Sequence, residues 1–476
     1  MNTQTAKILD LFSRINMIPR KSGQEKQIAD WLVSWSQKHG FNVKQDSAMN
    51  VYIYVPASAG REKAPIVILQ AHMDMVCEKT PESAHDFRKD PVKPVTSGDW
   101  LCAETTSLGA DNGIGMAFAL AMATDVSHPP LELLFTADEE TGLWGAKSIV
   151  RKNLAGRILI NLDSEEEGVF TIGCAGGRDT NITLPLSRKK LIPGKCFKMA
   201  IDGLRGGHSG IDIHKQRENA IVLLARLLRY LEVETRIMHL GDMAGGSAHN
   251  AIPRSAYAVA VVPNKQQSTF RKVFFKAAAN LKQITGVYEP GLKISLAPIK
   301  EKVPACSSED TVKIIRLLNA LPHGAAKMTA NSGLVETSNN LATLSIDMDN
   351  LNVLSSQRSF TAVQLDWITG RIESVAALAG ARYVSGEGYP GWQPNLSSKI
   401  LKLCKHVYTR KFGKEPRVEA VHAGLECGII GAKFRDMDMI SMGPTIKNPH
   451  CPQERLFLPS LSGVWDFLAE LMKEIQ

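Results

Sequence analysis

Acidic and histidine residues follow four apolar segments of this sequence, and both residue types can bind a metal ion or transfer a proton. His72 and Asp74 come after "IVILQ", and Glu139 and Glu140 come after "LELLFT". Such segments are typical of buried strands, and in parallel sheets ligands bind beyond the carboxyl ends of the strands. We therefore expect these side chains to meet at one edge of a sheet. Two further members of the set are Asp163, after "ILINL", and His450, after "DMISMG".

Asp111 lies in "SLGADNGIG", directly before an apolar helix predicted over 112–124. Taken alone, it fits a helix N-cap, just as an isolated His-x-Asp fits a strand that reaches the surface. If the helix packs back on the sheet, however, Asp111 faces the same edge. The repeated placement of these residues beyond apolar segments favours one shared site over several unrelated structural roles.

Two histidines and several carboxylates, without a cysteine cluster, suit Zn²⁺, Mn²⁺ or Co²⁺. A carboxylate that bridges two such ions lets them share a water molecule and lower its pKa. Glu139 and Glu140 can then have different tasks, because neighbouring side chains in an extended turn point in different directions. One would bind a metal ion, and the other would accept the proton of the water.

The elements that must position these residues alternate between strand and helix. Amphipathic helices are predicted over 4–17 and 23–38, and strands over 50–55, 64–70, 131–136, 157–162 and 436–443. This order predicts an α/β domain with a mostly parallel sheet. From about 181 the pattern changes to an α+β order that recurs once, so a duplication remains open. We expect a discontinuous catalytic domain over 1–180 and 384–476, with an inserted lid domain over 181–383.

The composition is that of an ordinary globular protein of two or three domains, with 476 residues and a formal net charge of +8. Lys and Arg are scattered, without the aromatic and basic stripe of a nucleic-acid-binding surface. No signal peptide or membrane-spanning segment is evident. The eight cysteines form no Cys-x-x-Cys pair, which favours reduced thiols. We therefore expect a cytoplasmic enzyme that binds neither nucleic acid nor membrane.

Nine motifs in fixed order carry a family resemblance: "HMDMV", "SLGADNGIG", "ADEETG", "NLDSEEEG", "GGHSG", "NAIPR", "YPGWQP", "HAGLECG" and "MGPTIKNPH". The chain resembles the bacterial aminoacyl-histidine dipeptidases, which are carnosinase-like Xaa-His dipeptidases of the M20 metallopeptidase family. The match extends over essentially the whole chain. It implies a di-metal hydrolase domain with a lid.

The resemblance also implies two divalent metal ions per chain, with zinc preferred to manganese or cobalt. His72, Asp111 and Asp163 would hold one ion. Asp111, Glu140 and His450 would hold the other, so that Asp111 bridges the two. The family pattern further implies a cis peptide bond between Asp111 and Asn112.

Three residues match the family's catalytic positions. Glu139 corresponds to the general base, and Asp74 to the carboxylate that orients His72. His208, in "GGHSG", would donate to the oxyanion of the tetrahedral intermediate when the lid closes. A turn histidine in a glycine-rich loop is the structural alternative for His208.

Four residues match or adjoin substrate-binding positions. Asn250 and Arg358 resemble positions that bind the substrate's C-terminal carboxylate, which the guanidinium fork of an arginine pairs with well. In "HAGLECG", Gly424 and Glu426 would line the cleft, and Glu426 could meet a free substrate amine. For His422, a role near the site and a role in the core both stay open.

The resulting hypothesis is a dipeptidase that cleaves Xaa-His dipeptides of the β-Ala-His type and other unblocked dipeptides, as a monomer or a homodimer. An aminoacylase or N-acyl amino acid deacylase on the same scaffold is the first alternative. A catalytically inactive peptide-binding homologue is the second. The inactive form would be expected to lack a ligand or Glu139, and the sequence retains them all.

Overall fold

The computed structural model describes residues 3–189, 192–330 and 333–476. The chain folds into two compact units. Unit 1 comprises 1–174, 392–420 and 425–476, and unit 2 comprises 175–391 and 421–424. The expected domain boundaries lay at 180/181 and 383/384. The units instead divide at 174/175 and 391/392, because β9 begins at Gly176 and Tyr389 pairs with Gly177 in a backbone bridge.

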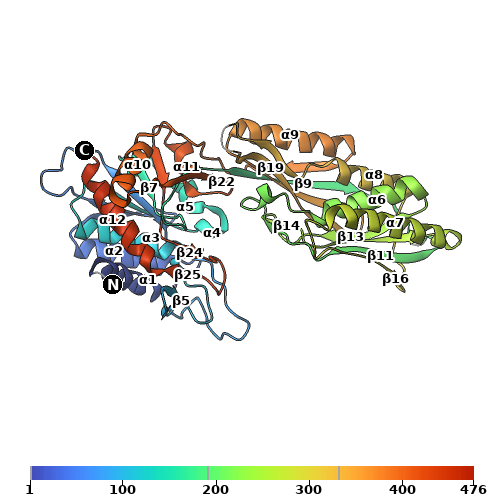
Figure 1. The fold of residues 1–476 in the computed structure, drawn as a ribbon, viewed down its shortest axis with the longest axis horizontal. Helices are drawn as coiled ribbons and strands as arrows, with labels where there is room; N and C mark the ends of the chain where they lie inside the picture. The colour runs from blue at the N-terminus through green and yellow to red at the C-terminus, as the bar shows by residue number, and fades with distance from the viewer. Residues whose placement is uncertain (1–2, 190–191, 331–332) are drawn as a thin grey trace. The chain divides into compact units, whose positions relative to one another are not determined.

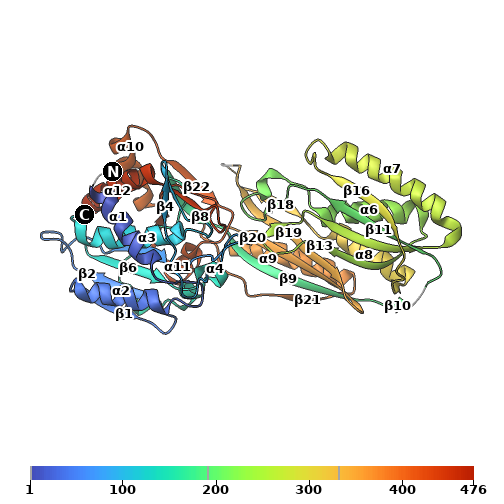
Figure 2. The same cartoon turned by 90° about the horizontal axis from the view of Figure 1, so that it is seen from below.

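Unit 1 contains an eight-stranded mixed sheet (Figures 1 and 2). Its four central strands, β6, β3, β7 and β23, pair in parallel, and antiparallel strands flank them on both sides. In sheet order the strands are β1 (Asn42–Gln45), β2 (Val51–Val55), β6 (Leu131–Thr136), β3 (Val67–His72), β7 (Ile158–Asn161), β23 (Asp438–Ser441), β8 (Val169–Cys174) and β22 (Arg417–Val421). β3 is buried along its whole length, which explains why its sequence is apolar without alternation.

Helices and a small antiparallel sheet complete unit 1. α3 packs on β3 and against α1, and α1 also contacts α12. The helices are α1 (Thr3–Asn16), α2 (Lys26–Lys38), α3 (Ala110–Asp125), α4 (Glu139–Gly142), α5 (Trp144–Ser148), α10 (Lys399–Phe412), α11 (Glu426–Lys433) and α12 (Leu458–Glu474), with a 3-10 turn at Arg151–Asn153. The small sheet has the order β24 (Ile446–Lys447), β25 (Arg455–Phe457), β5 (Trp100–Cys102) and β4 (Val95–Ser97).

Unit 2 contains a nine-stranded sheet in which neighbouring strands pair antiparallel throughout. Its main path is β16 (Lys293–Ile299), β11 (Lys195–Asp202), β15 (Ala256–Val262), β13 (His239–Gly245), β19 (Val335–Ile346), β20 (Asn350–Ser359), β9 (Gly176–Pro185) and β21 (Arg382–Ser385), and β18 (Gly324–Met328) pairs with β19. Two short pairs accompany it: β10 (Arg188–Lys189) with β17 (Ala305–Cys306), and β12 (Gly207–His208) with β14 (Ala251–Ile252).

Four helices cover one face of this sheet, namely α6 (Ala220–Thr235), α7 (Gln267–Thr285), α8 (Ser308–Ala320) and α9 (Ala362–Leu378) (Figure 1). Short 3-10 turns lie at Ile213–Lys215 and Asn264–Gln266. The two faces of β15 differ in how much apolar surface they bury. Its residues Ala258, Ala260 and Val262 join the large core beneath the helices, whereas Val259 and Val261 belong to a small cluster.

These observations confirm the predicted α/β domain with an inserted α+β unit. α8, β9 and β13 were not predicted from the sequence. All eight cysteines are free thiols. Among the described residues, none of the helices has the length and apolarity that a membrane crossing needs.

Candidate metal centre

His72 is the last residue of β3, and three carboxylates surround its ring. Nδ1 lies 3.3 Å from Asp74 Oδ1, while Nε2 lies 3.1 Å from Asp111 Oδ1 and 3.4 Å from Asp163 Oδ1. Burial disfavours the charged ring, but Asp163, Asp111 and Asp74 outweigh this effect and raise the pKa of His72 well above its usual value. A ring whose Nδ1–H faces Asp74 has Nε2 available for a metal ion.

Asp111 lies between the two histidines. Its Oδ1 is 3.1 Å from His72 Nε2, and its Oδ2 is 3.0 Å from His450 Nε2. Burial alone would raise the pKa of Asp111, but contacts with His450 and His72 lower it below the ordinary value. The peptide bond to Asn112 is cis, as the family resemblance implied. Asp111 therefore has the two-sided position that a bridging ligand requires.

Glu140 and His450 complete the second group. His450 Nε2 lies 3.2 Å from Glu140 Oε1, a buried oxygen that accepts no hydrogen bond in the described part of the chain. Burial lowers the pKa of His450, but Asp111 and Glu140 raise it to about 11. The two carboxylates thus favour positive charge at this position.

The side chains fit a metal site by type and spacing. Ligand atoms lie within 4.8 Å of one another in three overlapping sets: His72, Asp111 and Asp163; Asp111, Glu140 and His450; and His72, Glu139 and Glu140. Imidazole nitrogens and carboxylate oxygens suit zinc and related divalent ions. Burial, together with Asp111 and Glu140, raises the pKa of Asp163 to about 6. A divalent cation would relieve this repulsion between buried acids, and the orphaned oxygen of Glu140 would gain a partner.

Glu139 adjoins the same cluster. Burial, Glu140, Asp163 and Glu426 together raise its pKa well above the ordinary glutamate value, against an opposing effect of His72. Glu139 begins the short helix α4, and Asp138 before it has a positive φ of 51° that turns the chain sharply after β6. Glu139 and Glu140 are therefore presented together at the end of this strand.

Asp74 has more partners than the sequence indicated. Besides His72, its carboxylate accepts the backbone N–H of Glu139 at 3.0 Å, the N–H of Glu140 at 3.2 Å and the hydroxyl of Ser22 at 2.7 Å. Burial raises the pKa of Asp74, but His72 and these donors lower it overall. One buried carboxylate thus fixes both the His72 ring and the turn that carries the two glutamates. Ser22, which the sequence did not single out, belongs to this group.

The remaining residues expected to bind substrate divide between the units. Glu426 lies in unit 1 at the start of α11, fully buried, and its Oε2 accepts from Gln70 Nε2 and Thr136 Oγ1, both at 2.6 Å. Burial raises its pKa to about 7. Its observed contacts are therefore with the ends of β3 and β6. His208, Asn250, Arg358 and Gly424 lie in unit 2.

Within unit 2, His208 and Asn250 lie on neighbouring segments, since Ser209 N donates to the carbonyl of Asn250 at 2.7 Å. Nδ1 of His208 accepts the N–H groups of Gly210 and Ile211 at 3.1 and 3.0 Å. A neutral His208 ring therefore carries its proton on Nε2, the form needed in a hydrogen-bond donor.

Arg358 is buried in unit 2 and donates from Nη1 to the hydroxyl of Tyr389 at 2.9 Å. Its Nε has no hydrogen-bond partner among the described residues. Tyr389 also lies against Gly424, where an added Cβ would be 2.8 Å from the ring. Tyr389 was not selected from the sequence, although its motif "YPGWQP" was.

His422 is buried beside the same residues. Its Nε2 lies 2.7 Å from Ser338 Oγ, and its ring packs edge-on against Phe360. Burial, Arg358 and His208 lower the pKa of His422 to about 3. Its surroundings thus favour a neutral ring.

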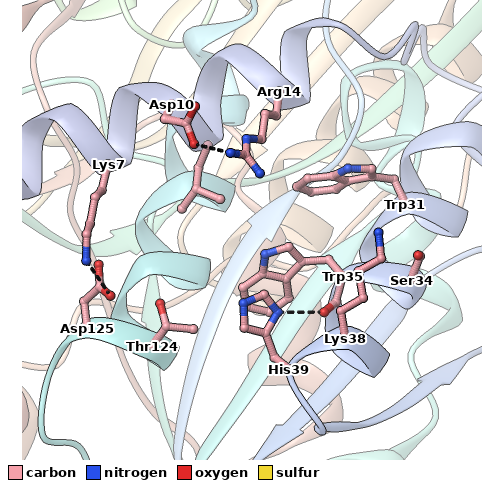
Figure 3. Close-up of a pocket in the computed structure, with 11 residues that line it drawn as sticks. Lys7, Asp10, Arg14, Trp31, Ser34, Trp35, Lys38, His39, Thr124 and Asp125 are labelled. Carbon is pink, nitrogen blue, oxygen red and sulfur yellow. Dashed lines mark hydrogen bonds and ion pairs between the residues drawn. The ribbon is translucent and has the colours of Figure 1, made fainter.

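A separate cavity of about 310 Å³ lies in unit 1, lined by α1, α2 and the end of α3 (Figure 3). It shares no residue with the metal-binding sets. Four of its charged groups form ion pairs with one another, Lys7 with Asp125 at 3.1 Å and Arg14 with Asp10 at 2.9 Å. The candidate site is accordingly the ligand cluster and not this cavity.

Comparisons with known proteins identify the family of this chain. The model of peptidase family M20/M25/M40 matches residues 68–474. The cytosol non-specific dipeptidase of Escherichia coli (strain K12) is 40% identical over 470 residues, which is 98% of this chain and 97% of that protein.

The similarity to solved structures extends over both units of this chain. The crystal structure of an aminoacylhistidine dipeptidase from Vibrio alginolyticus has 37% sequence identity and a TM-score of 0.89, covering 99% of this chain and 97% of that one. An M20 family metallo-carboxypeptidase from Sulfolobus solfataricus, at 15% identity and a TM-score of 0.55 over 99% of both chains, shares the fold. The predicted family and fold class are confirmed. The chain belongs to peptidase family M20/M25/M40.

Proposed function

We propose that this protein is a metal-dependent dipeptidase. The observation that supports this most directly is the position of Asp111 between His72 and His450, with Glu139 and Glu140 beside them. The names of the two relatives that match nearly the whole chain, a non-specific dipeptidase and an aminoacylhistidine dipeptidase, support the reaction class.

The proposed centre holds two divalent ions. His72, Asp111 and Asp163 would hold one, and Asp111, Glu140 and His450 would hold the other. This donor set of imidazole nitrogens and carboxylate oxygens suits Zn²⁺, Mn²⁺ and Co²⁺, and the family resemblance favours zinc. When bound, such ions lower the pKa of a water molecule and polarise a carbonyl oxygen.

The chain's own residues perform the proton transfers. Glu139 accepts a proton from the attacking water and then passes it to the amine that leaves. Burial and the nearby carboxylates raise its pKa above the ordinary glutamate value, which makes it a stronger proton acceptor. Asp74 holds Glu139 in place through the backbone of the turn, and it also orients His72.

Unit 2 has the role of the lid that we expect from the sequence, and its residues contact the substrate. His208 donates its Nε2–H to the oxyanion of the substrate carbonyl. Arg358 and Asn250 receive the C-terminal carboxylate of the dipeptide, and Gly424 lines the cleft. The buried and unpartnered Nε of Arg358 is consistent with a fork that is completed by an anion.

For substrate and compartment, we propose unblocked dipeptides, including Xaa-His dipeptides such as β-Ala-His, and the cytosol. The names of the two relatives, a cytosol non-specific dipeptidase and an aminoacylhistidine dipeptidase, support both parts of this proposal. An aminoacylase on this scaffold would use the same metal ligands and Glu139 but would prefer an N-acylated amino acid.

A substrate panel tests the proposal. The protein is reconstituted with Zn²⁺, Mn²⁺ or Co²⁺ and assayed against β-Ala-His, ordinary dipeptides, a tripeptide and an N-acetyl amino acid. We expect hydrolysis of the dipeptides, including β-Ala-His, and little of the other two compounds. A Glu139→Gln preparation controls for contaminating peptidases. Preferential cleavage of the N-acetyl compound would contradict the proposal.

A further inference from the structure

The backbone turn that leads into Asp111 is held by buried side chains from two distant parts of the chain. Arg20 lies in the loop between α1 and α2, and Glu454 lies directly before β25. Their exposed fractions are 1% and 2%, respectively. Two buried groups of opposite charge at one turn require a specific account, because burying charge is costly unless it is paired or hydrogen-bonded.

Arg20 joins the turn to the loop that follows His72. Its Nη1 donates to the carbonyl oxygens of Met73 at 3.2 Å and Asp74 at 3.0 Å, and its Nη2 donates to the carbonyl oxygen of Gly109 at 2.6 Å. The adjacent Lys21 forms a backbone bridge with Met75. The guanidinium therefore ties the backbone beside one ligand, His72, to the backbone beside another, Asp111.

Glu454 holds the same turn by its N–H groups. Its Oε2 accepts from Leu108 N at 2.7 Å and Gly109 N at 2.9 Å, and its Oε1 accepts from Asp111 N at 3.1 Å. Glu454 follows the ligand His450 by only four residues. It therefore links the loop of His450 to the backbone of Asp111, as Arg20 links the loop of His72 to it.

Gly109 shows how closely the turn fits the guanidinium. It has a positive φ of 69°, and a Cβ added there would lie 2.4 Å from Arg20 Nη2. Asn16 adds to the arrangement, since its Nδ2 donates to the carbonyl of Leu108 at 2.9 Å and its Oδ1 accepts from Arg20 Nη2 at 3.1 Å. Carbonyl and N–H groups of one short turn thus meet a buried cation and a buried anion.

We infer that Arg20 and Glu454 are a pair of positioning residues that set the distance of Asp111 from His72 and from His450, and thereby the affinity of the centre for both metal ions. The inference rests on the proposed function. The hydrogen bonds described above go to backbone groups and Asn16, so the pair acts through the ligand loops.

The test compares Arg20→Lys and Glu454→Gln with the wild-type chain. Lysine keeps the charge of Arg20 but cannot reproduce its forked contacts, and glutamine keeps the shape of Glu454 but lacks its charge. Zinc dissociation constants are measured by competition with a chromogenic chelator, and bound ions per chain by elemental analysis. Circular dichroism and thermal unfolding of the metal-free proteins report the fold.

We expect both variants to keep the fold when metal-free and to show dissociation constants raised about tenfold to a hundredfold, the usual effect of losing a group that orients metal ligands. The matched controls are Arg14→Lys and Glu415→Gln, whose side chains are 63% and 65% exposed. They should stay within about twofold of the wild type on the same scale.

The double variant sharpens the test, because groups that act on one turn are coupled. We expect the loss in the double variant to be smaller than the sum of the two single losses. If the wild type binds two ions and both folded variants bind them equally well, the inference is wrong. If Arg20→Lys does not fold, the near-isosteric Glu454→Gln decides alone. A wild-type chain that binds no divalent ion would overturn the proposed metal function, and this inference with it.

Discussion

Glu139 and Glu140 are neighbours in sequence but have different partners. Glu140 Oε1 lies 3.2 Å from the candidate ligand His450, whereas Glu139 has a pKa raised by burial and by nearby carboxylates, Glu140 first among them. This difference supports the division into one metal ligand and one proton acceptor that the sequence suggested. Both are held by the same carboxylate, Asp74, through their backbone N–H groups.

The two glutamates should therefore respond differently to the same substitution. Glu139→Gln should lower kcat by at least about a thousandfold, because the proton acceptor is lost, while both ions stay bound. Glu140→Gln should reduce the number of bound ions, because a carboxylate ligand is lost. Steady-state kinetics and elemental analysis of both variants check this. Near-normal turnover by Glu139→Gln would show that another residue is the base.

Tyr389 is a second residue whose contacts predict a measurable role. Its hydroxyl accepts a hydrogen bond from Arg358, which we propose receives the substrate carboxylate. Tyr389→Phe should raise KM for dipeptides several-fold and change kcat little, since one hydrogen bond that aligns Arg358 is worth about 1 kcal/mol. Tyr383→Phe, in β21 at 42% exposure, is the matched control. Equal KM values for the two variants would exclude this role.

The metal-ligand candidates were recognisable at this scale because each follows an apolar strand or, for Asp111, precedes an apolar helix. The hydrogen bonds that Arg20 and Asp74 form with distant backbone groups were not predictable. Arg20 reaches the carbonyl of Gly109 across 89 positions in the chain, and Asp74 binds N–H groups 65 and 66 positions away. Bonds from a side chain to a distant backbone group leave no periodic pattern in the sequence.

Among the elements, the short segment 421–424 has a consequence for stability. It belongs to unit 2 and carries His422, whose pKa burial, Arg358 and His208 lower to about 3. The folded state therefore favours the neutral ring, whereas the unfolded chain takes up a proton near pH 6.5. The stability contributed by this ring is complete above pH 6.5 and is lost progressively as the pH falls toward 3.

Replacing His422 should therefore make the free energy of unfolding depend less on pH below pH 7. Between pH 7 and pH 5, the free energy of unfolding should fall by about 2 kcal/mol less in metal-free His422→Asn than in the metal-free wild type. Urea unfolding at several pH values measures this. His406→Asn, at an exposed position on α10, should follow the wild type. Parallel profiles for His422→Asn and wild type would contradict the prediction.

Elements were predictable where the sequence has a strong period. β6 spans the predicted residues, and α1, α2 and α3 lie within a few residues of their predicted bounds. β9 and β13 were missed because they contain polar residues and glycines without a clear alternation. For α8 a signal was present, since Ser307 caps the helix by accepting from Asp310 N.

For the whole molecule, every candidate metal ligand lies in unit 1. Ions that bind the folded state stabilise it by about 2.7 kcal/mol when their concentration is a hundred times the dissociation constant. Removing them with a chelator should therefore speed hydrogen exchange in β3 and β7 of unit 1. Exchange in β11 and β15 of unit 2 should change little. Mass spectrometry of peptides from these strands checks this, and equal acceleration in both units would contradict it.

The order of the ligands along the chain has a further consequence for biosynthesis. His72, Asp111 and Asp163 all precede the long segment 175–391 of unit 2, whereas His450 and Glu454 follow it. A ribosome therefore completes the first ligand set before it begins unit 2. The second set receives its last member, His450, only after that unit has been made, and the Asp111 turn likewise receives Glu454. The two halves of the proposed centre are thus completed at separate stages of translation, although they share Asp111.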